Sequence, residues 1–208
     1  MDTKNTNLEK TIENLKANNF DTSLVKDKEA ALEAVKSILV PGSSVACGGS
    51  VTLLECGVVD YMQSGIFEFL DRFKPGADAN ELADIAWKTK KCDYFLLSAN
   101  AITENGEIFN VDATGNRISA LIHGPKNVVI VAGTNKIVSD LAAARDRVRK
   151  TAGPSNAKRL KLSTPCVEDG VCHDCDSDKR ICCFYLTSDF QRNKDRKKVI
   201  LVEEALGY

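Results

Sequence analysis

The sequence predicts an α/β protein with a mostly parallel open sheet and helices on both faces. Short apolar runs alternate with stretches of helical periodicity, the arrangement that produces parallel strands joined by crossover helices. The run NVVIVA at 127–132 is almost entirely β-branched and apolar, as expected of a strand buried on both faces. A chain of 208 residues is long enough for a single domain with a substantial core.

The first half of the chain alternates between helical and strand patterns. Leu8, Ile12 and Leu15 recur at helical spacing, and Asp27 is a suitable N-cap for a second helix that ends at Pro41-Gly42. The expected elements are a helix over 8–19, a helix over 27–39, a strand over 44–47, a helical stretch over 53–61, a strand over 66–70 and a helix over 79–90.

The second half continues the pattern and adds a cysteine-rich insertion. The expected elements are a strand over 93–98, a short strand over 107–111, a helix over 117–122, a strand over 127–132, a long helix over 139–151 and a last strand over 198–202. We therefore expect one domain over 1–208. The segment 163–185 is inserted between its last long helix and its last strand as a metal-binding loop.

Composition excludes several classes of protein. A net charge of -1 and a pI near 6.2 give no general attraction to nucleic acid or to an anionic membrane. No apolar stretch approaches the length of a membrane span, and the first residues lack the apolar segment of a signal peptide. We expect a cytoplasmic protein in a reducing compartment, where disulfides seldom persist and clustered cysteines bind metal.

Three polar loops, over 48–50, 98–106 and 133–136, follow predicted strands. Ligands collect at the carboxyl ends of parallel strands, so three such loops at one edge predict a crevice for an anion. The dinucleotide fingerprint and the P-loop pattern are both absent from the sequence. The candidate substrate-binding residues are Gly48, Gly49, Ser50, Asn100, Thr103, Asn116, Arg117, Gly133, Asn135 and Lys136. Ordinary turns, and a surface salt bridge of Arg117, are the alternative interpretation.

Five of the eight cysteines fall at 166–183 with the spacing C-x5-C-x2-C-x6-C-C. Buried structural cysteines have no reason to cluster, so this density predicts metal ligands. Zinc and iron–sulfur clusters both accept four thiolates, and one C-x2-C pair with long, uneven flanks suits a cluster at least as well as zinc. Neighbouring side chains point apart, so only one of Cys182 and Cys183 is expected to be a ligand. His173 is an alternative or supporting ligand.

Basic residues crowd the approach to this segment. They are Arg145, Arg147, Arg149, Lys150, Lys158, Arg159 and Lys161. One interpretation is a solvated helix face. The other is a site for an anionic substrate or a negatively charged cluster.

Several motifs together resemble one known family. They are Asn-Ala-Ile-Thr-Glu at 100–104, Gly-Asn-Arg at 115–117, Asn-Lys-Ile-Val at 135–138 and Thr-Pro-Cys at 164–166. With the closing run KKVILVEEALGY, they make nearly the whole chain similar to the LUD-domain (lactate utilisation) family. The likeness is to its stand-alone, cysteine-loop branch, found largely in anaerobes.

The resemblance implies a fold similar to the sugar-isomerase and CoA-transferase-like superfamily, which agrees with the alternation above. It implies a [4Fe-4S] cluster on Cys166, Cys172, Cys175 and Cys182, because Cys183 falls where relatives commonly have another residue. It further implies a small anionic metabolite such as a 2-hydroxy acid, and an iron–sulfur oxidoreductase as partner.

Three functions fit these expectations. The first is an accessory iron–sulfur protein of L-lactate or 2-hydroxy-acid utilisation. The second is a cluster-dependent enzyme, of hydro-lyase or isomerase type, in which an open iron acts as a Lewis acid. The third is a zinc-stabilised binding domain. All three are compatible with a homo-oligomer, and none calls for nucleic acid or a membrane.

Overall fold

The computed structural model describes residues 3–208, and the main sheet within them confirms the α/β prediction. Its six strands lie in the order β1-β10-β7-β4-β2-β3, and every neighbouring pair is parallel. The strands are β1 (Asp21–Val25), β2 (Ser44–Cys47), β3 (Glu68–Phe69), β4 (Tyr94–Leu97), β7 (Asn127–Gly133) and β10 (Lys197–Val202). Strand β1 was not expected from the sequence, and β3 is shorter than the strand expected over 66–70.

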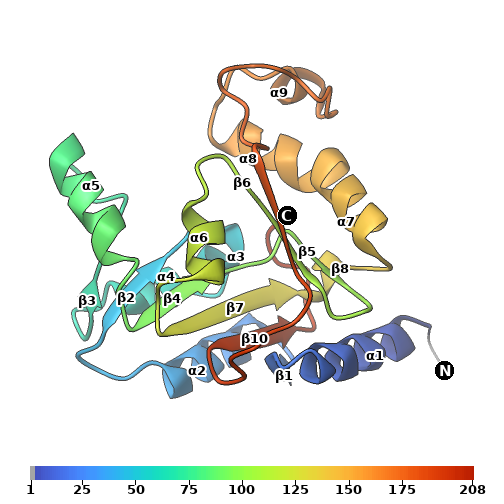
Figure 1. Ribbon diagram of the computed structural model, residues 1–208, viewed down its shortest axis with the longest axis horizontal. Coiled ribbons are helices and arrows are strands. Elements are labelled where there is room, and N and C mark those ends of the chain that lie inside the picture. Colours follow the sequence, from blue (N-terminus) through green and yellow to red (C-terminus); the bar gives the residue numbers. More distant parts are fainter. Residues whose placement is uncertain (1–2) are drawn as a thin grey trace.

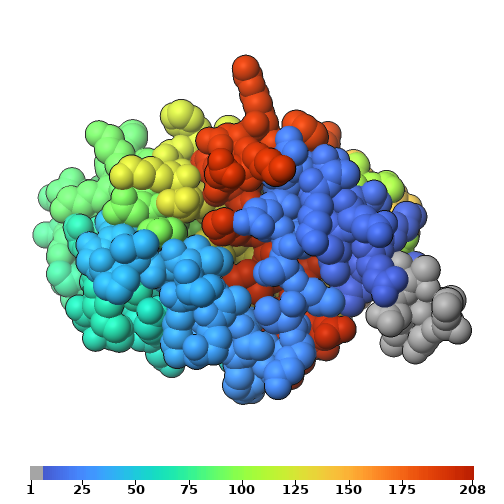
Figure 2. Space-filling view, turned by 90° about the horizontal axis from the view of Figure 1, so that it is seen from below, coloured from blue at the N-terminus to red at the C-terminus, as the bar shows by residue number. Residues whose placement is uncertain are grey.

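Helices cover both faces of this sheet, and the central strands are therefore apolar on both sides. Along β7, Val128 and Ile130 join the core on one face, while Val129 and Val131 join the core on the other. Helices α2 (Lys28–Ile38), α3 (Val51–Glu55) and α4 (Val58–Met62) contribute to the second core. Helices α1 (Thr3–Ala17) and α6 (Asn116–Ile122) contribute to the first, with α5 (Ala79–Lys88) at its margin. Figure 2 shows the surface formed by the N-terminal helices, with residues near the C-terminus between them.

A second sheet was not expected from the sequence. It has the order β8-β5-β6-β9 and is built from β5 (Ala101–Thr103), β6 (Ile108–Asp112), β8 (Ile137–Val138) and β9 (Phe184–Ser188). The expected strand over 107–111 exists, but it pairs antiparallel with β5 and β9 in this sheet. Ile102 and Ile108 pack into the first core, whereas Phe109 packs against α7 (Leu141–Arg147).

The long helix expected over 139–151 is longer and is interrupted by a wide turn. Helix α7 runs into a π-helical turn, Val148–Ala152, and then into α8 (Gly153–Arg159). Pro154 lies just after the wide turn and has no backbone N–H to donate, which favours such an interruption. A Cβ at Gly153 would lie 2.9 Å from the Val148 carbonyl oxygen and 3.4 Å from Cys182 Sγ, so this position requires glycine.

The cysteine-rich segment follows α8 and lies over the end of the molecule opposite β1 and α2 (Figure 1). Its one helix is α9 (Cys166–Asp169), and its far end leads into β9. Strand β9 pairs with β6 from Asp112↔Phe184 onward, which attaches the segment to the second sheet. None of the described helices has both the length and the apolarity needed to cross a membrane.

Candidate functional site

The three predicted polar loops meet at one edge of the main sheet. Strands β7, β4 and β2 are consecutive neighbours, so their carboxyl ends lie side by side. Residues that follow these ends line a cavity of about 220 Å³. Of the ten candidate residues, six line it: Gly49, Ser50, Asn100, Asn116, Arg117 and Lys136.

The other four candidates have structural contacts instead. A Cβ at Gly48 would lie 2.5 Å from Arg117 Cγ, so this glycine makes room for the arginine. Thr103 Oγ1 donates to the Glu107 carboxylate over 2.6 Å and closes a turn. Gly133 lies against the 204–206 backbone, and the Asn135 side chain bonds to the backbone of the same C-terminal segment.

Lys136 is the most unusual group in the cavity. It is only 2% exposed, and its Nζ donates to Thr52 Oγ1 over 2.8 Å and to Ser98 Oγ over 2.9 Å. Burial, followed by the positive charges of Arg147 and Arg117, lowers the pKa of Lys136 to about 7. Among the described residues it forms no salt bridge, so the fold holds an amine that is neutral for much of the time at neutral pH.

Replacing Lys136 with methionine is expected to stabilise the protein most at acidic and neutral pH. The pKa of Lys136 falls from 10.5 in the unfolded chain to about 7 in the folded protein. In the pH window between these two values the unfolded chain binds more protons than the folded protein, so the free energy of unfolding of the wild type rises with pH. The advantage of the variant should therefore shrink by up to about 1.4 kcal/mol per pH unit there. Urea denaturation of both proteins across the window measures it, and a pH-independent difference would contradict the assignment.

Arg117 is engaged with neighbouring groups rather than free for a ligand. Its Nη2 lies 2.6 Å from Asp112 Oδ1, its Nε donates to the same oxygen over 2.7 Å, and Nη2 also donates to Asn100 Oδ1. The other Asp112 oxygen accepts from the backbone N–H groups of Arg117 and Ile118. The pair is mostly buried, so Asp112 cancels much of the charge expected from Arg117. Arg117, a candidate from the sequence, therefore lines the cavity with its Nε and Nη2 donors already engaged.

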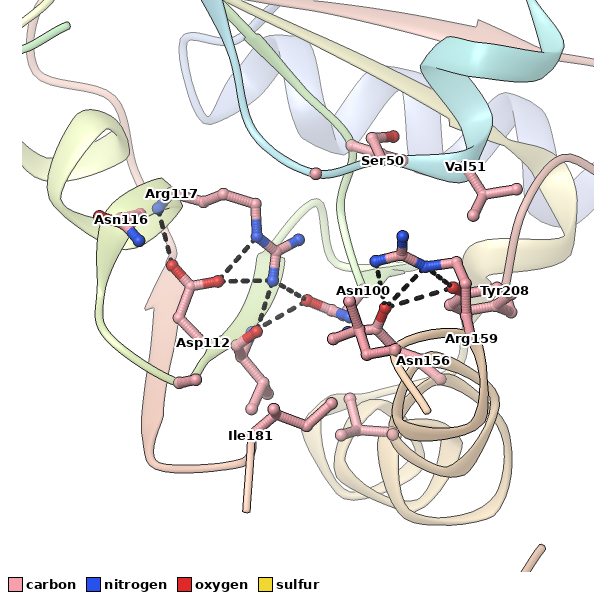
Figure 3. Close-up of a pocket in the computed structure, with 18 of the residues that line it drawn as sticks. Ser50, Val51, Asn100, Asp112, Asn116, Arg117, Asn156, Arg159, Ile181 and Tyr208 are labelled. Atoms are coloured by element: carbon pink, nitrogen blue, oxygen red, sulfur yellow. Dashed lines mark hydrogen bonds and ion pairs between the residues drawn. The ribbon is translucent and has the colours of Figure 1, made fainter. Parts of the chain in front are cut away.

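Two other arginines supply uncancelled charge. Arg159 is one of the basic residues that the sequence offered for an anionic substrate, whereas Arg72 was not singled out. Arg159 Nε donates to Tyr208 Oη over 2.7 Å and to Asn156 Oδ1 over 3.1 Å, and Arg72 also lines the cavity. In the part of the chain that the structure describes, neither arginine forms an ion pair. Figure 3 shows Arg117 and Arg159 reaching in from opposite sides. The charge balance of the cavity wall is therefore positive.

A second cavity, of about 170 Å³, collects four of the clustered cysteines. Cys166, Cys172, Cys175 and Cys182 line it, whereas Cys183 is exposed and lies outside the lining. Burial, with Cys172 and Cys166 nearby, raises the pKa of Cys182 to about 11. Within residues 3–208, no three His, Cys, Asp or Glu side chains come together closely enough to hold a single metal ion. The four predicted ligands thus surround one space without converging on one point.

Arginines surround this second cavity. Arg145, Arg149 and Arg180 are part of its lining. Arg180 donates to the carbonyl oxygens of Cys175 and Cys182, and among the described residues its buried Nε has no partner. An unpartnered buried donor on an arginine that lines a positively charged space suits a negatively charged occupant. His173 also lines this cavity, and its Nε2 lies 2.8 Å from Asp169 Oδ2.

The remaining cysteines are core thiols. Cys47, Cys56 and Cys92 are buried, and burial is the main cause that raises their pKa values to about 12, 11 and 12. Cys47 lies just before a helix N-terminus, a position that can lower the pKa of a thiol, but desolvation dominates here and raises it.

The two cavities share a wall. Gly153, Ile181 and Cys182 line both of them. Gly153 begins α8 directly after the π-helical turn, and its missing side chain leaves room for the Cys182 sulfur. An occupant bound to Cys182 would therefore lie next to a molecule bound beside Lys136.

Comparisons with known proteins agree with this architecture. The model of the family described as the LUD domain matches residues 8–202. The crystal structure of a DUF162 family protein from Deinococcus radiodurans, at 1.70 Å resolution, is similar over 97% of this chain and 99% of that chain. Its TM-score is 0.56 at 14% sequence identity, a likeness that concerns the fold alone. No curated protein matches the chain.

Proposed function

The chain belongs to the LUD-domain family, and from that premise we propose that it is an iron–sulfur protein of lactate or related 2-hydroxy-acid utilisation. Membership of the family supports a role related to lactate utilisation. The cluster and the small anionic metabolite are our proposal, and each rests on one of the two cavities.

The observation that carries the cluster is the set of four cysteines around one cavity. Cys166, Cys172, Cys175 and Cys182 would hold a [4Fe-4S] cluster, which takes four thiolates and carries a net negative charge. The three arginines and the unpartnered Arg180 Nε suit that charge. When bound, such a cluster supplies one-electron transfer, or Lewis acidity if one iron is left without a protein ligand.

The sequence spacing of the thiols, one C-x2-C pair with long and uneven flanks, favours a cluster over a single zinc ion. The four thiols surround a space of about 170 Å³. Zinc remains the alternative that the metal analysis below tests.

The cavity beside Lys136 suits a small carboxylate. Its volume of about 220 Å³ is below the roughly 300–1,000 Å³ of typical drug-sized sites, so a metabolite of a few carbons fits best. Arg159 and Arg72 offer guanidinium groups that form no ion pair with any residue that the structure describes. A bound 2-hydroxy acid would have its carboxylate on these groups and its hydroxyl carbon toward Lys136 and Ser98.

Four thiols are available, enough for every iron of the cluster to have a protein ligand. Lewis-acid catalysis needs one iron without a protein ligand, and therefore only three cysteine ligands, so the four thiols favour the accessory, electron-transferring role. An iron–sulfur oxidoreductase as partner stays a prediction, as does self-association. The shared wall at Cys182 would place the metabolite and the cluster in contact through one residue.

Metal analysis of protein purified without oxygen tests the cluster. After reconstitution with ferrous iron and sulfide, we expect nearly equal amounts of iron and acid-labile sulfide, and a broad visible absorbance that dithionite bleaches. A colourless protein that carries zinc and takes up no iron would overturn the proposal in favour of a zinc-stabilised domain.

Replacing Arg159 with glutamine is expected to weaken the binding of L-lactate about tenfold or more. A hydrogen bond to a charged group is worth about 1.5–3 kcal/mol, and each 1.4 kcal/mol is tenfold in affinity. Calorimetric titration measures the change. Lys158→Gln is the matched control, because it removes the same charge one residue away and outside the cavity lining. Equal affinities in the two variants would remove Arg159 from the site.

A further inference from the structure

We propose that Lys136 is a covalent nucleophile, which forms an imine with the carbonyl carbon of a small 2-oxo acid bound in the cavity at the carboxyl ends of β2, β4 and β7. The inference rests on the carboxylate site proposed above, and it does not depend on the metal. It adds a reaction to a residue that the sequence assigned only to anion binding.

The partners of Lys136 allow both of its protonation states. Thr52 and Ser98 contact Nζ through hydroxyl oxygens, which accept hydrogen bonds from an ammonium and can donate one to a neutral amine. A carboxylate in their place would fix the ammonium form. Among the described residues no acid forms a salt bridge with Lys136, although Glu55 lies close enough to raise its pKa slightly.

The electrostatic surroundings also favour a reactive amine. With a pKa of about 7, roughly half of the Lys136 side chains are neutral at pH 7, whereas an ordinary lysine is almost fully charged. Desolvation and neighbouring cations are the two means by which proteins activate a lysine for attack on a carbonyl. Both act here, through burial and through Arg147 and Arg117.

Position in the cavity distinguishes Lys136 from the other buried lysine. Lys197 is also only 6% exposed, and burial, followed by Arg196, lowers its pKa to about 8. Its Nζ, however, lies over the Phe20 ring, 5.8 Å from the ring centre, and Lys197 lines neither cavity. The two lysines thus form a natural pair, similar in burial and different in access.

The chemistry needs no partner beyond the 2-oxo acid. The lone pair of the neutral amine attacks the carbonyl carbon, the C=O electron pair moves onto oxygen, and one proton passes from nitrogen to that oxygen to give a carbinolamine. Loss of one proton from nitrogen and of hydroxide from carbon then forms the C=N bond and releases one water. The hydroxyls of Ser98 and Thr52 are placed to exchange the protons, and Arg159 and Arg72 to hold the carboxylate.

Reductive trapping tests the inference on the full chain. The wild-type protein is incubated with pyruvate or glyoxylate and sodium cyanoborohydride, and the adducts are located by peptide mass spectrometry. We expect Lys136 to be labelled at least tenfold more than Lys197, and acetone, which has no carboxylate, to label it far less. Lys136→Arg should lose the adduct while Lys197→Arg keeps it.

The outcomes separate this inference from the proposed carboxylate site. Labelling of Lys136 no greater than that of Lys197 overturns the inference. If calorimetry still detects pyruvate binding in that case, the carboxylate site stands without covalent chemistry. If neither binding nor labelling occurs, both proposals fail. Locating the adducts on the wild-type protein by mass spectrometry decides between these outcomes even if the Lys136→Arg variant does not fold.

Discussion

Replacing Cys175 with serine is expected to remove nearly all bound iron, whereas replacing Cys183 with serine should leave the iron content close to that of the wild type. Cys175 lines the cysteine cavity, and Arg180 contacts its carbonyl oxygen. Cys183 is exposed and points away, with its Sγ directed to the Arg180 carbonyl oxygen. A serine hydroxyl is a much poorer ligand for iron than a thiolate, so loss of one of four ligands should destabilise the cluster.

Iron and sulfide content of proteins reconstituted side by side measures this difference. The pair is a strict comparison, because both changes lie in the same segment and replace the same atom. Near-complete iron in Cys175→Ser, or equal loss in both variants, would mean that the ligand set is wrong. Cys182→Ser should behave like Cys175→Ser, since Cys182 lies in the same cavity beside Cys183 in the chain.

Replacing Asp112 with alanine is expected to lower the free energy of unfolding by about 3–5 kcal/mol, the usual cost of leaving one member of a buried ion pair alone. Asp112 is 6% exposed and accepts from Arg117 Nε and from two backbone N–H groups at the start of α6. Without it, the Arg117 guanidinium stays in a mostly buried place without a counterion, and α6 loses the carboxylate that holds its first turn.

Urea denaturation at one pH measures the loss, with Asp146→Ala as the control. Asp146 also pairs with a cation, Lys150, at 2.7 Å, but that pair is exposed and spans one helical turn. The Asp146→Ala change should lower the free energy of unfolding by less than about 1 kcal/mol. Similar costs for the two changes would mean that the Arg117–Asp112 pair does not stabilise the fold as its burial implies.

The main sheet could be predicted from the sequence because its strands carry a local signal. Strand β7 is apolar on both faces, and β2, β4 and β10 are short runs of the same kind. Apart from β6, which was expected over 107–111, the second sheet carries no such signal. Strand β5 has three residues and β8 has two, too few to show a period, and β9 joins β6 across more than seventy residues of chain.

The candidate site was predictable in part, for a similar reason. The carboxyl ends of neighbouring parallel strands lie at the same edge of a sheet. The loops that supply Ser50, Asn100 and Lys136 could therefore be placed together from the sequence. Arg159 and Tyr208 come from α8 and from the last residues of the chain, and only the tertiary fold brings them to the cavity. The pairing of Arg117 with Asp112, five residues away, depends on the bend before α6, which composition does not specify.

The cysteine-rich segment is attached to the rest of the molecule at both ends but contributes almost nothing to the core. Helix α8 holds its start, while Cys183 N–H donates to the Asp112 carbonyl oxygen and β9 pairs with β6 at its end. Between 160 and 183, a stretch that the structure describes in full, Thr164 is the one buried residue. Loss of the proposed cluster should therefore open this short stretch to proteases and hydrogen exchange while both sheets stay folded, so that cluster occupancy would be visible as local order.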